Sequence, residues 1–145
     1  MSESSQKMQL LKALGDALLD PSATERERQN AKRALGHMAN ESVLTRLAEK
    51  ALSAESEAML MDVLDVLEQR PALGETEAAL LGFLYDASSL VRQRVLHLLG
   101  ARGSQRAVRT LDRLIEAASS QGSIFAEADL TAARRARNSI QRRAG

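Results

Sequence analysis

The sequence predicts an all-α protein built from repeated pairs of helices. Apolar residues recur at intervals of three and four along most of the chain, the spacing that lines one face of a helix. Aromatic residues make up only 2% of the 145 residues and there are two prolines, so Leu, Ala, Val and Met must build a helical core. The pattern around Leu35-Gly36 returns at Leu99-Gly100, 64 residues later, and half this offset brings Leu35 onto Leu67.

Residues 1–20 are expected to form an N-terminal capping helix that ends at Asp20-Pro21. Residues 22–52 form the first expected helix pair, and the run from Ser22 to Glu25 is interpreted as a capping box for its first helix. The apolar stripe of the capping helix consists of Met8, Leu11, Leu14 and Leu18. The inward face of the next helix is expected to consist of Ala31, Ala34, Leu35 and Met38.

Residues 56–85 form the second expected pair. Its first helix should run from Glu57 to Gln69, because Arg70-Pro71 breaks the pattern, and its second from Thr76 to Tyr85. The third pair, 88–119, begins with a Ser88 or Ser89 cap, and Gly100 is expected to end its first helix. Its apolar positions are Val91, Val95, Leu98 and Leu99, then, after a Ser104 cap, Ala107, Val108, Leu111, Leu114, Ile115 and Ala118.

The C-terminal part, 124–145, is expected to form one basic helix that closes the far end. The run SSQGS before it is typical of a flexible joint, and the helix should extend from about Phe125 to Arg143. Its apolar positions are Leu130, Ala133, Ala136 and Ile140. The total is about eight helices.

One stretch, 86–115, resembles a known repeat family. The residues that carry the resemblance are Asp86, Val91-Arg92, Val95, Leu99-Gly100, Gly103, Ala107-Val108 and Leu111. This pattern is similar to the HEAT-like repeat, in the variant known from phycobilin lyases and many bacterial adaptor proteins. The resemblance implies a short right-handed α-solenoid of about three helix pairs that serves as a binding surface. It also implies that the second helix of each pair lines the concave side.

The central helix on that side has an unusual composition. From Ala78 to Tyr85 it reads AALLGFLY, with no charged residue. Alignment with the third pair predicts that Leu80, Phe83 and Leu84 face the core, whereas Ala78, Leu81, Gly82 and Tyr85 point outward. Three interpretations stay open: the outward residues form a partner-binding groove, the first helix or the tail of the chain covers them, or the assignment of the helix faces is rotated.

Arginines on the next helix extend this candidate site. Arg106, Arg109 and Arg113 share one helical face, and with the apolar residues they would suit a peptide or helix that has hydrophobic anchors and acidic flanks. The alternative is an ordinary solvated face that Asp112 and Glu116 partly neutralise. The predicted contact residues are Ala78, Leu81, Tyr85, Arg106, Arg109 and Arg113.

Charge is unevenly distributed along the chain. Residues 1–90 carry 9 Lys and Arg against 15 Asp and Glu, a net charge of −6, and residues 91–145 carry 11 against 4, a net charge of +7. The arginines Arg134, Arg135 and Arg137 of the last helix therefore make nucleic-acid binding a second hypothesis, although no aromatic residues are interleaved for stacking. A third hypothesis is a purely structural unit that self-associates, which the uneven charge could promote head to tail. As the oligomeric state, we expect a monomer or a weak homo-oligomer.

No residue set suggests catalysis, so we expect no enzyme activity, metal or cofactor. His37 and His97 lie in different repeats, and the carboxylate row Asp62, Asp65 and Glu68 is interpreted as a solvated helix face. Cysteine is absent. The N-terminal run does not resemble a signal peptide, and no apolar run approaches the length of a membrane span, so we expect a cytosolic protein that is not bound to a membrane.

Overall fold

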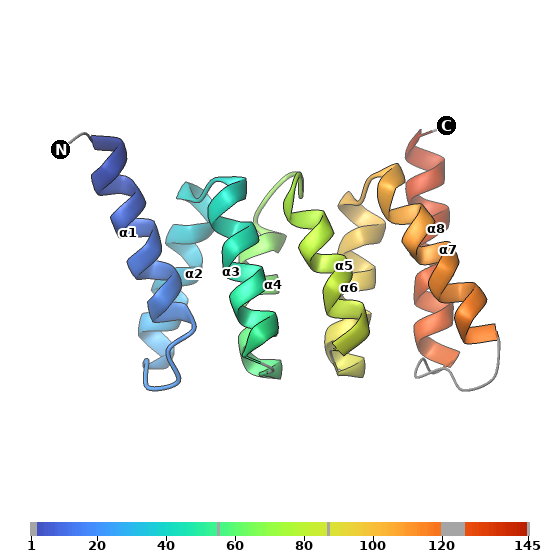
Figure 1. Ribbon diagram of the computed structural model, residues 1–145, viewed down its shortest axis with the longest axis horizontal. Coiled ribbons are helices and arrows are strands. Elements are labelled where there is room, and N and C mark those ends of the chain that lie inside the picture. Colours follow the sequence, from blue (N-terminus) through green and yellow to red (C-terminus); the bar gives the residue numbers. More distant parts are fainter. Residues whose placement is uncertain (1–2, 55, 87, 120–126, 145) are drawn as a thin grey trace. The chain divides into compact units, whose positions relative to one another are not determined.

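The computed structural model describes residues 3–54, 56–86, 88–119 and 127–144, and eight helices lie in these ranges (Figure 1). The helices are α1 (Glu3–Leu18), α2 (Glu25–Met38), α3 (Glu41–Ser53), α4 (Glu57–Glu68), α5 (Thr76–Asp86), α6 (Ser89–Arg102), α7 (Gln105–Ser119) and α8 (Glu127–Ala144). No strand occurs in the described ranges. The all-α prediction is confirmed.

The chain divides into two compact units, Met1–Thr76 and Glu77–Gly145. The boundary falls after Thr76, the first residue of α5, and therefore inside the expected pair 56–85. The two units have opposite net charges. Unit 1 carries 9 Lys and Arg against 13 Asp and Glu, a net charge of −4, and unit 2 carries 11 against 6, a net charge of +5.

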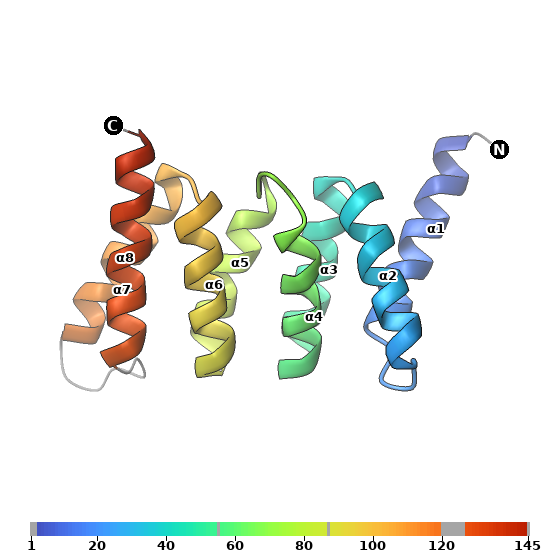
Figure 2. The ribbon, with the colours of Figure 1, turned by 180° about the vertical axis from the view of Figure 1, so that it is seen from behind.

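In unit 1, α1 packs against α2 and α3, and both of these pack against α4. Figure 2 shows α2 and α4 next to each other. The apolar face of α4 is buried as expected, because Leu60, Val63, Leu64 and Leu67 repeat at helical spacing. The other large apolar side chains buried in this unit are Leu11, Leu18, Leu35, Leu44, Leu47, Val66 and Leu73.

The capping box of α2 lies two residues after the expected one. Thr24 accepts a hydrogen bond from the Glu27 amide at 3.1 Å, and the Glu27 carboxylate accepts one from the Thr24 amide at 3.3 Å. Ser22, the expected cap, instead donates to Asp20 from both its amide and its hydroxyl group. Local bonding with an aspartate two residues earlier therefore holds Ser22 in the turn and moves the helix start to Glu25.

Four apolar positions in α1 and α2 are less buried than predicted. Met8 of α1 is 40% exposed and Met38 of α2 is 36% exposed, while Leu14 and Ala34 are half-buried. The buried face of α2 is rotated toward Lys32 and Gly36. The reason is the contact with α4: Lys32 reaches two aspartates of that helix, and Gly36 lies so close to the Gln69 side chain that a Cβ atom there would overlap it.

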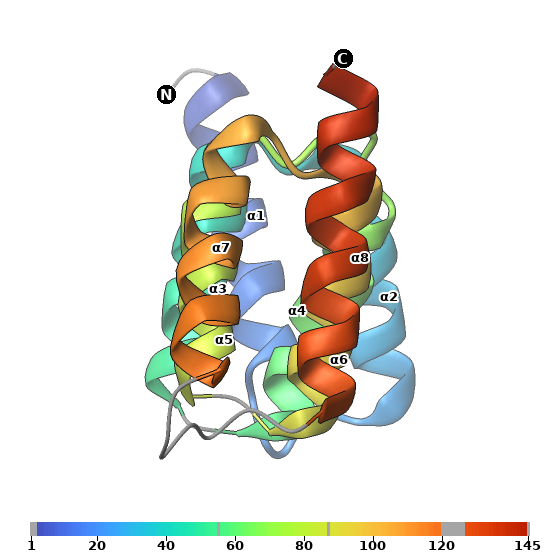
Figure 3. The same cartoon turned by 90° about the vertical axis from the view of Figure 1, so that its right-hand side faces the viewer.

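In unit 2, α8 packs along both α6 and α7. Figure 3 shows α6 and α8 on one side of this unit and α5 and α7 on the other. The last helix is thus docked, and its Ala133, Ala136 and Ile140 are buried as predicted, whereas Leu130 is half-buried. The other buried apolar residues of the unit include Leu80, Phe83, Leu84, Val91, Val95, Leu98, Leu99, Ala107, Val108, Leu111, Leu114 and Ile115. Of the expected joint, Ser119 is the last residue of α7. Residues 120–123, Phe125 and the side chains of Ala118 and Ser119 lie outside the described residues.

Gly100 does not end its helix, contrary to the prediction. Ser88 caps α6, which continues to Arg102 and is closed by Gly103. Gly100 is needed for helix packing, because a Cβ atom there would lie 3.2 Å from the Cα of Ala136 in α8. A glycine in mid-helix thus allows two backbones to approach closely, at a cost in helix propensity.

A contact near the helix ends recurs in the two units. Arg70, after α4, donates to the carbonyl oxygen of Gly36 in α2 at 3.2 Å. In unit 2, Arg143 of α8 donates to the carbonyl oxygens of Gly100 and Gly103 at the end of α6. Both arginines satisfy carbonyl groups that the end of a helix leaves without a partner. The arginine at the end of α8 thus binds the end of α6 in unit 2, as the arginine after α4 binds the end of α2 in unit 1.

Candidate protein-binding surfaces

The structure buries the predicted core face of α5 and exposes part of its predicted outward face. Leu80, Phe83 and Leu84 are completely buried, while Ala78 is exposed and Tyr85 is 52% exposed. Leu81 and Gly82, which were also expected to point outward, are half-buried. Tyr85 therefore presents an aromatic ring on a helix whose Ala78–Tyr85 segment carries no charge, a composition that suits an apolar anchor point.

Arg106, Arg109 and Arg113 lie on the exposed side of α7, opposite its buried apolar face. Within the described part of the chain, none of their guanidinium groups forms an ion pair. Asp112, which was expected to neutralise them, pairs instead with Arg137 of α8 at 3.3 Å. The three arginines are thus available to a ligand.

A hydrogen bond joins the start of α5 to the residue before α7. The Glu77 carboxylate accepts it from the Ser104 hydroxyl group at 2.6 Å, and the two helices run in the same direction (Figure 1). An equal offset of 28 residues separates Ala78 from Arg106, Leu81 from Arg109, and Tyr85 from Arg113. Because both helices rise about 1.5 Å per residue, the two residues of each such pair lie at similar distances along their helices from this contact. We call these six residues the α5–α7 surface.

The arginines of α8 are less free than the sequence suggests. Arg134 and Arg135 are exposed, but Arg137 is half-buried and pairs with Asp112. Arg143 is bound to the carbonyl oxygens at the end of α6. Some arginines of α8 therefore stabilise the packing of this helix against α6 and α7.

Unit 1 contains a groove that the sequence analysis missed. It lies between α1 and α3 and has a volume of about 250 Å³. Its apolar lining comes from Met8, Leu11, Gly15, Val43 and Leu47, and its charged lining from Lys12, Asp16, Arg46 and Lys50. Met8 was expected in the apolar stripe of an N-terminal capping helix. The available signal was Lys12 on the same side of that helix as Met8 and Leu11, but the residues of α3 that complete the groove could not be paired with them from sequence.

A second furrow, of about 670 Å³, lies between α6 and α8. Its walls consist largely of small residues, among them Gly100, Ala132 and Ala136, with His97 and Arg135 at its edge. Neither histidine has a metal-binding environment, because among the described residues no group of three His, Asp or Glu side chains could hold a metal ion.

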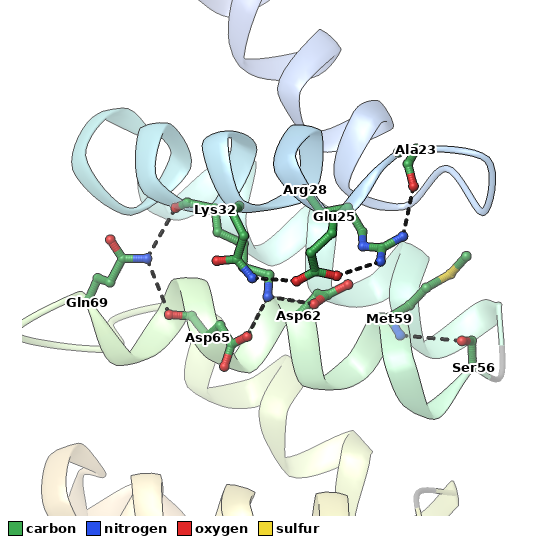
Figure 4. A network of polar contacts seen from close by, with 10 residues as sticks. Ala23, Glu25, Arg28, Lys32, Ser56, Met59, Asp62, Asp65 and Gln69 are labelled. Atoms are coloured by element: carbon green, nitrogen blue, oxygen red, sulfur yellow. Dashed lines mark hydrogen bonds and ion pairs between the residues drawn. The ribbon is translucent and has the colours of Figure 1, made fainter.

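The carboxylate row of α4 was expected to be a solvated helix face. Two of its three members instead have a structural role. Asp62 and Asp65 flank the Lys32 ammonium group at 2.8 and 2.7 Å, as Figure 4 shows, while Glu68 is exposed. Burial alone would lower the pKa of Lys32, but the hydrogen bonds and charges of the two aspartates outweigh it and raise the pKa above the ordinary value of 10.5. Gln69 extends this network by donating to the Lys32 carbonyl oxygen.

Comparisons with known proteins identify no relative: no family model matches the chain, and neither characterised proteins nor solved structures give a match. Among the helices that the structure describes, none combines the length and the apolar character needed to cross a membrane.

Proposed function

We propose that this protein is a non-catalytic, cytoplasmic protein-binding adaptor that receives an acidic, amphipathic peptide or helix on the α5–α7 surface. The observation that carries this proposal is the row formed by Arg106, Arg109 and Arg113. These arginines are exposed and have no ion pair among the described residues, and each lies about as far along its helix from the contact between Glu77 and Ser104 as an uncharged residue of α5 does. The tyrosine and leucine would anchor the partner, and the arginines would orient its carboxylates.

The proposal includes the architecture, a short HEAT-like solenoid of three helix pairs. The pairs are α2 with α3, α4 with α5, and α6 with α7, and α1 and α8 act as caps. Its support is the recurrence of one contact in each unit, Arg70 with Gly36 and Arg143 with Gly100. The exposed arginines of α8 would keep the last helix from stacking on another copy, because like charges repel and are costly to desolvate.

Protein binding is preferred over nucleic-acid binding for two reasons. Tyr85 and Leu81 add apolar contacts that a phosphate backbone would not use. Arg137 and Arg143, which would have to contribute to a phosphate-binding helix, are already bound within the unit. The net charge of +5 on unit 2 is nevertheless the observation that favours nucleic acid as the second candidate.

The test is fluorescence anisotropy with a labelled synthetic peptide that has leucines on one helical face and glutamates on the other. We expect Arg109→Glu to weaken binding by about tenfold or more and Tyr85→Ala by about tenfold, the scale of about 1.4 kcal/mol for a contact residue. The matched control is Arg134→Glu, which makes the same charge change on an exposed part of α8. Circular dichroism establishes that all variants are equally folded.

Three results would count against the proposal. One is equal loss of affinity in the Arg134 and Arg109 variants, which would indicate attraction to net charge only. Another is tighter binding of a single-stranded oligonucleotide than of the peptide, with a steep salt dependence, which would favour the nucleic-acid function. The third is concentration-dependent association of the free protein that Tyr85→Ala abolishes, which would indicate a self-associating unit.

A further inference from the structure

A second docking surface is present in unit 1, independent of the α5–α7 surface. The groove between α1 and α3 has a buried apolar floor, to which Leu11 and Leu47 contribute. Met8 forms part of its wall and is 40% exposed, so the groove presents an apolar side chain to solvent. A volume of about 250 Å³ is near the lower limit for ligand pockets, and it would accept one or two aliphatic side chains.

The net charge of the groove lining is positive, whereas the net charge of the unit that contains it is negative. Unit 1 has a net charge of −4, yet the charged lining residues are three cations, Lys12, Arg46 and Lys50, and one anion, Asp16. All four side chains are exposed. A basic site within an acidic unit selects an acidic ligand locally and gives little general attraction to the phosphate backbone of nucleic acids.

These cations are largely unused. Lys12 and Arg46 form no ion pair with any residue that the structure describes. Lys50 reaches Asp16 across 3.7 Å, and both side chains are at least half exposed. An exposed pair at this distance contributes little stability, so a carboxylate from a partner could replace Asp16 at low cost.

We propose that the α1–α3 groove binds an acidic amphipathic helix of another protein, which inserts one or two aliphatic side chains beside Met8 and places carboxylates on Lys12, Arg46 and Lys50. Together with the α5–α7 surface, this groove would give the adaptor two binding surfaces. The alternative occupant is a second copy of this chain, whose exposed Leu10 and Met38 belong to the acidic unit, and the experiment below distinguishes it from another protein.

The experiment is chemical-shift mapping by NMR on the full, isotope-labelled chain, titrated with the leucine–glutamate peptide and with a version in which lysine replaces glutamate. Mapping separates this proposal from the previous one, because amides of α1 and α3 report on the groove and amides of α5 and α7 on the other surface. We expect the glutamate peptide to shift α1 and α3, with a binding constant at least tenfold better than that of the lysine peptide.

Two matched pairs of variants test the residues. Met8→Ser should weaken binding at α1 and α3 by about tenfold. Leu10→Ser should not, although Leu10 is 49% exposed on the same helix, because it does not line the groove. Lys12→Glu should likewise weaken binding about tenfold, whereas Lys7→Glu, the same change at an exposed position outside the lining, should have an effect smaller than threefold.

The proposal is wrong if shifts stay confined to α5 and α7, if the lysine peptide binds α1 and α3 equally well, or if both members of either pair behave alike. It is also wrong if the α1 and α3 signals of the free protein broaden with its own concentration, because the occupant would then be a second copy. If the peptide shifts α1 and α3 but not α5 and α7, the groove proposal is supported and only the proposed binding at the α5–α7 surface is overturned.

Discussion

The carboxylate of Glu77, at the start of α5, accepts hydrogen bonds from both the amide and the hydroxyl group of Ser104, the residue before α7. Glu77 is almost fully buried, with 4% of its surface exposed. The negative charge lies at the N-terminus of α7, where the helix dipole favours it. One side chain thus joins the two helices that carry the α5–α7 surface.

The first prediction is that Glu77→Ala destabilises unit 2 by about 2 kcal/mol, because the Ser104 amide and hydroxyl lose a buried acceptor. Glu77→Gln, which keeps one acceptor oxygen, should cost about half as much. Urea unfolding measures both. Glu116→Ala, which removes an exposed carboxylate from α7, is the control and should change stability by less than about 0.5 kcal/mol. Equal stability of the Glu77 and Glu116 variants would show that the buried contact is unimportant.

The second prediction concerns Lys32, whose folded-state pKa is raised. Because the folded state holds the proton more tightly, this stabilisation is complete below the unfolded pKa of about 10.5 and is lost as the pH rises through the folded value. Wild-type stability should therefore fall at alkaline pH. Lys32→Met should lose about 2 kcal/mol at neutral pH, because Asp62 and Asp65 lose their cation, and should show a weaker alkaline decline. Parallel alkaline curves for the two proteins in urea unfolding would exclude this role.

The third prediction is that Asp129 holds α8 in place. Its carboxylate accepts from Arg92 at 3.1 Å and from Gln93 at 2.6 Å, and both Arg92 and Asp129 are largely buried. Asp129→Ala leaves the arginine without this carboxylate and should cost about 3 kcal/mol. Hydrogen exchange should accelerate throughout α8 before it does in α7. If exchange in α8 matches the wild type, or if Arg134→Ala accelerates it as much, the ion pair is not what docks the helix.

The fourth prediction uses the close approach of α6 and α8. Gly100→Val should cost about 2 kcal/mol, since its side chain would meet the backbone of Ala136, which cannot move aside as a flexible side chain can. Thermal unfolding and α8 hydrogen exchange measure the effect.

Gly15 in α1 is the contrasting position. An added Cβ atom there would lie 3.5 Å from Leu47 Cδ1, an ordinary contact, so Gly15→Ala should stabilise the protein by up to about 1 kcal/mol through helix propensity. A destabilised Gly15→Ala variant, or a Gly100→Val variant as stable as the wild type, would contradict this account of the two glycines.

Helix number, helix type and most of the core could be predicted because these depend on local periodicity. The spacing of Leu60, Val63, Leu64 and Leu67 decides which face of α4 is apolar, whatever lies opposite. The same reasoning correctly separated Leu80 and Phe83 from Tyr85 on α5, because the repeat transferred the face from the third pair to the second. Periodicity contains no information about which polar group meets which, and the errors at Ser22 and at Asp62 and Asp65 were of this kind. The error at Gly100 came instead from a close backbone contact between two helices.

The sequence by itself predicted an all-α chain, the eight helices found in its described part, and the exposed positions of Ala78, Tyr85 and the arginines of α7, although not the half-buried position of Leu81. Only the tertiary structure decided that Gly100 is a packing residue, that Asp62 and Asp65 bind Lys32, that Asp112 pairs with Arg137 and leaves the arginines of α7 free, and that α1 and α3 enclose a basic groove. The physical reason is the separation along the chain of the residues that interact. Amphipathic patterning acts over one or two turns of a helix, whereas ion pairs, close backbone contacts and grooves require residues about 25 to 40 positions apart to meet in space.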